Sequence, residues 1–236
     1  MRWILANDVE DMGRIAAEIV LAYVKSHHES VLALPTGRTP EAMYNKLAEA
    51  CQTQQCFEHT TLFNLDEYAG LATDHPSSFA SYVRRCFIDR VKIDKSRCHA
   101  PNGVAPSLEA ECARYQRAIQ LAGGLDLAVL GLGTNGHIGF NEPGTPFSSN
   151  THVVNLSEST RASNAEYFTG GEVPKQAITM GIETIMSADR ILLLAGGARK
   201  KEAIRRLREE SASPAFPASA LRNHRDVTII TDRAAG

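Results

Sequence analysis

Short apolar runs alternate with segments whose apolar residues recur at helical spacing, and this alternation limits the possible folds more than any other feature. The runs have the length and composition of strands buried on both faces of a sheet; they are Trp3–Leu5, Ser30–Leu34, Thr61–Leu65, Leu125–Leu130, Arg190–Ala195 and Val227–Ile230. Helical patterns fall between them at Val9–Val24, Pro40–Ala50, Ser77–Phe87, Ser107–Leu121, Thr160–Phe168 and Lys200–Glu210. The alternation predicts an α/β fold with a doubly wound, Rossmann-like, mostly parallel sheet and helices on both faces.

The chain of 236 residues contains no internal repeat, low-complexity tract or linker that would divide it. We therefore expect residues 1–236 to form a single domain. The most irregular stretch, residues 144–174, is rich in Gly, Ser and Asn and follows a glycine-rich loop. We expect this stretch to be a lid.

Charge and cysteine content exclude several classes of function. With 25 basic and 27 acidic residues, the chain has no charge excess with which to bind nucleic acid or an anionic membrane. We find no signal peptide and no apolar segment long enough to cross a bilayer, so we expect a cytoplasmic protein. The five cysteines form no Cys-x-x-Cys pair, which favours free thiols over a disulfide framework.

The segment Gly131–Pro143 follows the predicted strand Leu125–Leu130 and places Asn135, His137 and Glu142 among four glycines. Loops at the carboxyl ends of parallel strands bind small molecules in open α/β sheets. The alternative is a glycine-rich connection with a solvent-facing histidine. The spacing Gly131-x-Gly133-x-x-Gly136 also fits a dinucleotide fingerprint, but no amphipathic helix follows it, and a fingerprint alone is weak.

Two other loops should reach the same edge of the sheet. The first contains Thr36, Gly37, Arg38 and Thr39, with Thr39 as the expected N-cap of a helix that begins at Pro40. Free amides, the helix dipole and Arg38 could hold a phosphate or carboxylate there, although an ordinary capped helix start explains the same residues. The second loop places Asp66 and Glu67 after the strand Thr61–Leu65; the alternatives are a solvated turn or a helix N-cap.

Taken together, Leu34–Pro40, Asn64–Tyr68 and Gly131–Pro143 closely resemble the signature segments of the glucosamine-6-phosphate deaminase family. The likeness extends over nearly the whole chain, including Val173–Gly181 and Phe216–Ser219. The 6-phosphogluconolactonase family is similar in the Gly-His loop, but typically continues with a Ser-Leu-Phe-Pro type segment. Here the continuation is Phe140-Asn141-Glu142-Pro143.

The resemblance implies an aldose–ketose isomerisation coupled to loss of ammonia, without metal or cofactor. Glucosamine 6-phosphate and water would give fructose 6-phosphate and ammonium. By the family pattern, Asp66 is the base that moves a proton from C2 to C1. His137 would open the sugar ring, because histidine titrates near neutral pH. Glu142 would orient His137, with Asn135 as a further orienter at a position where some members have aspartate.

The resemblance also places a phosphate site at Thr36, Gly37, Arg38, Thr39 and Lys200. Many members bring an arginine from the lid onto the phosphate, but the matching residue here is Glu166. A metal site built from Asp66, His137 and Glu142 would have one nitrogen ligand, which suits zinc or iron poorly, so we expect no metal.

Two alternatives to the deaminase stay open: a phosphosugar lactonase and a catalytically silent sugar-phosphate sensor. A sensor would need an output module, for which this chain has no room beside the predicted domain. The resemblance implies that hexameric relatives activated by N-acetylglucosamine 6-phosphate hold the phosphate of this effector with two basic residues at a subunit boundary. The corresponding positions in this chain are His152 and Val154. Without those permanent charges we expect hyperbolic kinetics, no such activation, and a monomer, with a dimer as the alternative.

Overall fold

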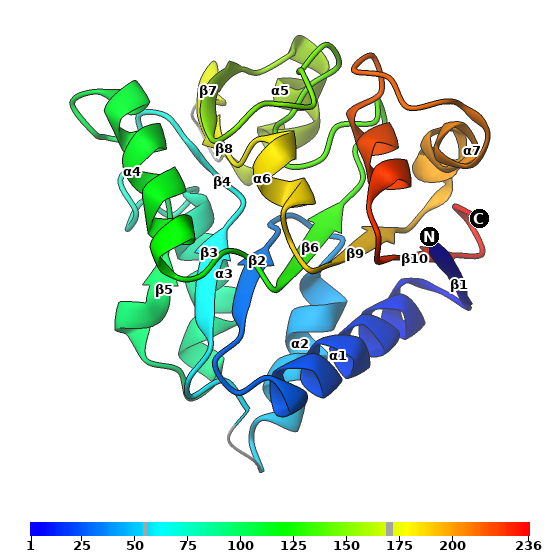
Figure 1. The fold of residues 1–236 in the computed structure, drawn as a ribbon, viewed down its shortest axis with the longest axis horizontal. Helices are drawn as coiled ribbons and strands as arrows, with labels where there is room; N and C mark the ends of the chain where they lie inside the picture. Colours follow the sequence, from blue (N-terminus) through cyan, green and yellow to red (C-terminus); the bar gives the residue numbers. More distant parts are fainter. Residues whose placement is uncertain (54–55, 169–171) are drawn as a thin grey trace.

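The computed structural model describes residues 1–53, 56–168 and 172–236. Its main sheet has seven parallel strands in the order β1-β10-β9-β6-β2-β3-β5 (Figure 1). Their bounds are β1 (Arg2–Ala6), β2 (Val31–Leu34), β3 (Thr61–Asn64), β5 (Cys98–His99), β6 (Leu127–Gly131), β9 (Arg190–Ala195) and β10 (Val227–Asp232). The six apolar runs are all strands of this sheet, which confirms the predicted α/β fold.

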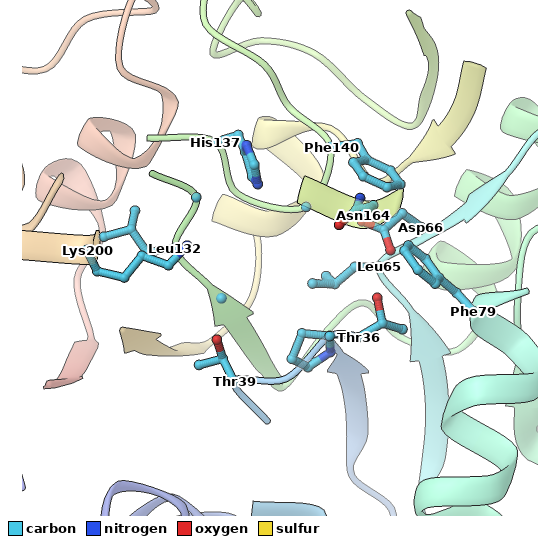
Figure 2. A pocket seen from close by; sticks show the side chains of 15 residues that line it. Thr36, Thr39, Leu65, Asp66, Phe79, Leu132, His137, Phe140, Asn164 and Lys200 are labelled. Atoms are coloured by element: carbon cyan, nitrogen blue, oxygen red, sulfur yellow. The ribbon is translucent and has the colours of Figure 1, made fainter. Parts of the chain in front are cut away.

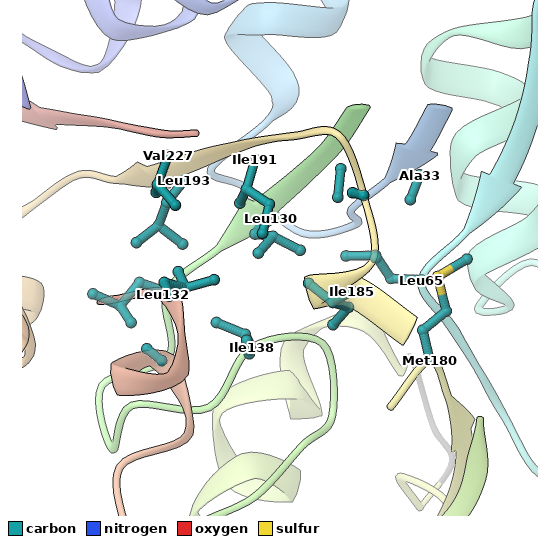
Figure 3. Packing of buried hydrophobic residues seen from close by; sticks show 14 of the residues in the cluster. Ala33, Leu65, Leu130, Leu132, Ile138, Met180, Ile185, Ile191, Leu193 and Val227 are labelled. Carbon is teal, nitrogen blue, oxygen red and sulfur yellow. The ribbon is translucent and has the colours of Figure 1, made fainter. Parts of the chain in front are cut away.

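Helices cover both faces of the sheet. Successive side chains of a strand point to opposite faces, so alternate strand residues belong to two different apolar clusters, one on each face. One face packs on α1 (Val9–Ser26), α2 (Glu41–Ala50) and α3 (Phe79–Cys86). The other packs on α4 (Leu108–Leu121), α6 (Ile182–Met186) and α7 (Lys201–Glu209), and Figure 3 shows this cluster around Leu130, Ile191 and Leu193. Short 3-10 helices connect these elements: η1 (Ile88–Arg90), η2 (Lys95–Arg97), η4 (Ala198–Lys200) and η5 (Pro217–Asn223).

A second, antiparallel sheet was not predicted. It contains three strands in the order β4-β8-β7, namely β4 (Asp66–Tyr68), β8 (Gln176–Thr179) and β7 (His152–Asn155). A small apolar cluster packs on it; its buried members are Tyr68, Phe140, Leu156, Val173 and Ala177. The expected lid, residues 144–174, is thus partly regular, since it holds β7, α5 (Glu158–Asn164) and η3 (Ala165–Tyr167). Residues 169–171 of this stretch lie outside the described residues.

The helices α1 and α2 begin in different ways. Asp8 caps α1, since its Oδ1 accepts a 2.8 Å hydrogen bond from the amide of Asp11. The prediction of Thr39 as the N-cap of α2 is wrong: Pro40 holds that position, and no side chain caps the helix. The side chain of Thr39 is therefore not used in helix capping.

The strand order brings the candidate loops together. The strands β9, β6, β2 and β3 are consecutive neighbours in the main sheet and run parallel. Their carboxyl ends therefore meet at one edge, and the chain order reverses between β6 and β2, the arrangement at which open α/β sheets bind ligands.

Among the described residues, no helix is long and apolar enough to span a bilayer.

Candidate active site

A cavity of about 150 Å³ lies where these four strands end (Figure 2). Six residues singled out from the sequence line it: Thr36, Gly37, Thr39, Asp66, His137 and Lys200. They come from the segments that follow β2, β3, β6 and β9. Arg38, Asn135 and Glu142 do not belong to its lining.

Asp66 begins β4 and is 5% exposed. Its side chain lines the cavity together with those of Phe140 and Asn164 (Figure 2). Burial, together with the charge of Glu67, raises the pKa of Asp66 to about 8. A carboxyl group with this pKa can hold or release a proton near neutral pH.

The neighbouring Glu67 points elsewhere and has a structural role. Its carboxylate accepts hydrogen bonds from the amides of Tyr68 (2.9 Å), Phe79 (3.0 Å) and Ala80 (2.9 Å). Burial raises the pKa of Glu67 to about 7, against the lowering effect of these three donors. Of the two adjacent acids, Glu67 is thus the one that binds the start of a helix, and Asp66 is the one that lines the cavity.

His137 is held by a tight turn in the loop after β6. The amide of Gly133 donates to the carbonyl of His137 at 2.9 Å, and Gly136 has a φ of +90°, which favours glycine. Burial lowers the pKa of His137 to about 4, although the charge of Glu142 acts in the opposite direction. Its Nδ1 is buried and has no hydrogen-bond partner among the described residues. The imidazole is therefore neutral at pH 7.

Glu142 and Asn135 form a second layer behind His137. Asn135 Nδ2 donates to Glu142 Oε2 at 2.9 Å, and Asn135 Oδ1 accepts from the amide of His137 at 3.1 Å. Glu142 Oε1 accepts from Ser157 Oγ at 3.0 Å and from Thr160 Oγ1. Glu142 is thus linked to His137 in two ways: hydrogen bonds through Asn135 reach the backbone amide of His137, and the charge of Glu142 acts on the imidazole.

Ser157 and Thr160 were not predicted as site residues, although the sequence contains a helix-capping pattern at Ser157. Ser157 is the N-cap of α5, and its Oγ accepts from the amide of Thr160 at 3.2 Å. A serine directly before a helical segment is a common N-cap pattern. What the pattern does not indicate is the third partner, Glu142, because that contact spans 15 residues.

The loop after β2 presents Gly37 with a φ of +93°. Tyr82 Oη donates to the carbonyl of Gly37 at 2.6 Å, and Tyr44 Oη to that of Pro35 at 2.6 Å. These bonds fix the loop through its carbonyls. On the other side of the cavity, Lys200 is partly buried, and burial together with Arg199 lowers its pKa from the ordinary value.

Arg38 lies outside the cavity and forms a salt bridge with Glu166 of η3. Its side chain is 69% exposed, so the pair sits at the surface. On this side, the segment from α5 to η3 contacts the cavity through Asn164, which the sequence analysis did not select. Phe79, Phe140, Leu65 and Leu132 also line the cavity without having been predicted.

Two further expectations were that the chain binds no metal and that His152 and Val154, which lie in β7, do not hold an effector phosphate. Across the described parts of the chain, no three His, Cys, Asp or Glu side chains gather in a group that could hold a metal ion. In β7, His152 Nδ1 hydrogen-bonds the carbonyl of Asn150 at 2.9 Å, while Val154 packs on the apolar cluster of the second sheet.

Comparisons with known proteins agree on one family. Residues 7–230 match the family of glucosamine-6-phosphate isomerases and 6-phosphogluconolactonases. The glucosamine-6-phosphate deaminase of Bacillus pumilus is 50% identical, over 98% of this chain and 96% of its own length. Glucosamine-6-phosphate deaminase 1 of Bacillus subtilis is also 50% identical, over 96% of this chain and 94% of its own.

Solved structures separate the two branches of this family. A monomeric glucosamine-6-phosphate deaminase of the NagB superfamily matches with a TM-score of 0.97 and 48% identity, covering 100% of this chain and 98% of that one. The 6-phosphogluconolactonase of Trypanosoma brucei gives 0.79 at 20% identity, covering 99% and 97%. The latter likeness extends to the fold alone.

Proposed function

Because the chain belongs to the glucosamine-6-phosphate isomerase and 6-phosphogluconolactonase family, we infer that it is a glucosamine-6-phosphate deaminase. It converts glucosamine 6-phosphate and water to fructose 6-phosphate and ammonium. The observation that carries this inference beyond family membership is the single cavity lined by Asp66, His137 and Lys200. It combines an acid–base pair with a cation and a loop suited to a phosphate.

The first step, opening of the sugar ring, is assigned to His137. One nitrogen of a neutral imidazole can take the proton of the C1 hydroxyl and then give it to the ring oxygen, which opens the ring. Support comes from its low pKa, which keeps the ring neutral at pH 7. Since Nδ1 is buried, Nε2 is the nitrogen that would meet the substrate.

The second step, proton transfer from C2 to C1 through an enolamine, is assigned to Asp66. One base must remove the C2 proton and return it to C1, which requires a group that is a carboxylate when substrate binds. In the free protein the pKa of Asp66 is raised to about 8. An ammonium at C2 of the substrate would lower this pKa again, because an opposite charge favours the ionised carboxylate. Addition of water at C2 and departure of ammonia then complete the reaction.

The phosphate is assigned to the loop of Thr36, Gly37 and Thr39, together with Lys200. Hydroxyls, free amides and one cation are the donors that a phosphate dianion requires. Arg38 stays in this set as a proposal with a condition, since it would first have to leave Glu166. The cavity volume of about 150 Å³ is small compared with the roughly 300–1,000 Å³ of typical ligand pockets. We therefore infer that the α5–η3 segment moves outward when the substrate binds.

Glu142 and Asn135 are assigned to positioning. Asn135 holds the backbone of His137, and Glu142 supplies the negative charge that favours protonation of the imidazole during ring opening. The bonds from Ser157 and Thr160 to Glu142 tie this layer to the first turn of α5.

Purified protein given glucosamine 6-phosphate and, separately, 6-phosphogluconolactone tests the function directly. We expect ammonium and fructose 6-phosphate in equal amounts from the first substrate, and no hydrolysis of the second above its spontaneous rate. Turnover of the lactone alone would assign the chain to the other branch of the family. Binding without turnover of either would favour the sensor.

The remaining proposals concern assembly and location. We propose that residues 1–236 act as one domain and as a monomer. Val154 presents no charge to an effector phosphate at β7, so we expect no effector site between subunits there. Hyperbolic kinetics without activation by N-acetylglucosamine 6-phosphate follow from that. A cytoplasmic location is supported by the five cysteines, none of which forms a disulfide in the part of the chain that the structure describes.

A further inference from the structure

A second cavity, of about 370 Å³, lies at the β3–β5 edge of the main sheet. Its volume falls in the range of roughly 300–1,000 Å³ typical of pockets for small ligands. Half of its lining is apolar or small, and half carries polar groups; the polar residues are Asn64, Thr73, Arg84, Lys95 and His99. None of these residues has a role in the proposed reaction.

The charge in this cavity is positive. Arg84 extends from α3, donates a 3.4 Å hydrogen bond to Ser81 Oγ, and forms no salt bridge among the residues that the structure describes. Lys95 pairs with Asp89 at 2.6 Å, which offsets its charge. Burial and Arg114 hold the pKa of His99 below its ordinary value, so His99 is neutral at pH 7. The guanidinium of Arg84 is therefore the charge left without a partner.

Asn64 gives a second, independent indication of a ligand. It is 5% exposed, and its Nδ2 has no hydrogen-bond partner within the described ranges. A buried amide donor without a partner is destabilising unless something accepts from it. Since Asn64 contributes to the lining, this unpartnered amide belongs to the wall of the cavity.

The cavity adjoins the candidate active site. In the first turn of α3, Phe79 lines the first cavity and Ala80 lines the second. The amides of both residues donate to the carboxylate of Glu67, next to Asp66. The two cavities thus share this turn as a wall.

We propose that the cavity at the β3–β5 edge is a second ligand site, which takes a small organic anion with a compact apolar body. The phosphate or carboxylate of the ligand would bind Arg84, and its apolar body would lie against Leu62 and Ile88. A further acceptor atom would satisfy Asn64. The site is independent of the deaminase reaction, because none of its polar groups belongs to the catalytic set.

Histidine-selective NMR of the full chain tests this proposal, with phenyl phosphate as the probe. The resonance of His99, assigned with His99→Gln, should shift in a saturable way. In Arg84→Ala the dissociation constant should rise by about 10-fold or more through loss of a charge-assisted bond. Lys92→Ala is the matched control, since Lys92 is exposed in the same region, carries the same charge and does not line the cavity.

The same spectra contain the results that would overturn the proposal. A shift at His137 alone would mean that the probe binds only in the first cavity. Equal weakening by Arg84→Ala and Lys92→Ala would mean nonspecific attraction to positive charge. Benzyl alcohol should leave His99 unshifted, and a response equal to that of phenyl phosphate would contradict an anion site. Benzoate in place of phenyl phosphate tells whether a carboxylate or a phosphate binds more tightly.

Discussion

The imidazole of His137 lies directly against Gly133: a Cβ at residue 133 would stand 2.5 Å from three atoms of the ring. Gly133 is not among the glycines with positive φ, so its backbone would accept alanine. The three atoms nearest to that Cβ all belong to the imidazole ring. The absence of a side chain at Gly133 allows the proposed ring-opening group its position.

Gly133→Ala should consequently disable the active site without disturbing the backbone. We expect kcat/KM for glucosamine 6-phosphate to fall by about 10²-fold, because displacing a catalytic group by about 1 Å costs that much. The control is the same change in a His137→Gln background, where the further loss should stay below about 3-fold. Full multiplication of the two losses in the double variant would show that Gly133 acts by another route.

The salt bridge between Arg38 and Glu166 suggests a second prediction. A substrate phosphate at the Thr36–Thr39 loop would compete with the Glu166 carboxylate for Arg38, and the carboxylate would also repel it. Glu166→Gln should therefore lower KM by about 2- to 5-fold, the size expected for an exposed charge pair. Steady-state kinetics at low salt would measure this, since screening weakens the effect.

Two comparisons sharpen the Glu166 measurement. Glu172→Gln, an exposed acid in the next described segment, should leave KM unchanged. The gain from Glu166→Gln should vanish in an Arg38→Ala background. If KM stays constant in Glu166→Gln, Arg38 takes no part in phosphate binding and its surface pair with Glu166 is structural only.

Lys200 is the proposed cation of the phosphate site. Lys200→Ala should raise KM by about 10-fold or more, with a smaller change in kcat, because a charge-assisted bond of about 1.5–3 kcal/mol is lost. The exposed neighbour Lys201 supplies the control, and Lys201→Ala should behave as wild type. An unchanged KM in Lys200→Ala would transfer the role to Arg199.

The buried carboxyl of Asp66 should make stability depend on pH. Its folded pKa of about 8 lies above the ordinary 3.8, so its favourable contribution is complete below pH 4 and is lost as pH rises towards 8. Asp66→Asn lacks this loss. Its melting temperature, compared with that of wild type, should gain roughly 5 °C or more between pH 5 and pH 9. A difference that stays constant over this range would show that Asp66 is already ionised in the folded protein at pH 5.

The sequence was sufficient for six of the seven strands of the main sheet, because buried parallel strands such as Leu127–Gly131 are continuous apolar runs. It was not sufficient for the second sheet. Asp66–Tyr68 is short and mostly polar, and it becomes a strand only by pairing with Gln176–Thr179, more than a hundred residues away. The two-residue strand Cys98–His99 is too short to show any periodicity.

The same distinction holds for the site. Asp66, His137 and Lys200 follow strands, so the topology of the fold predicts that they meet. The contacts from Ser157 to Glu142 and from Glu166 to Arg38 join segments whose relative positions depend on tertiary packing. The cavity-lining role of Asn164 likewise has no signature in the sequence.

The turnover of Asp66→Asn tests the central claim most directly. The substitution keeps the shape of the side chain and removes its basicity, and the measurement is ammonium release from glucosamine 6-phosphate under saturating substrate. If Asp66 is the base that moves the proton from C2 to C1, kcat should fall by roughly 10²–10⁴-fold while KM changes little. A variant that keeps more than about a third of the wild-type kcat would contradict the account, since losing a general base costs far more than that.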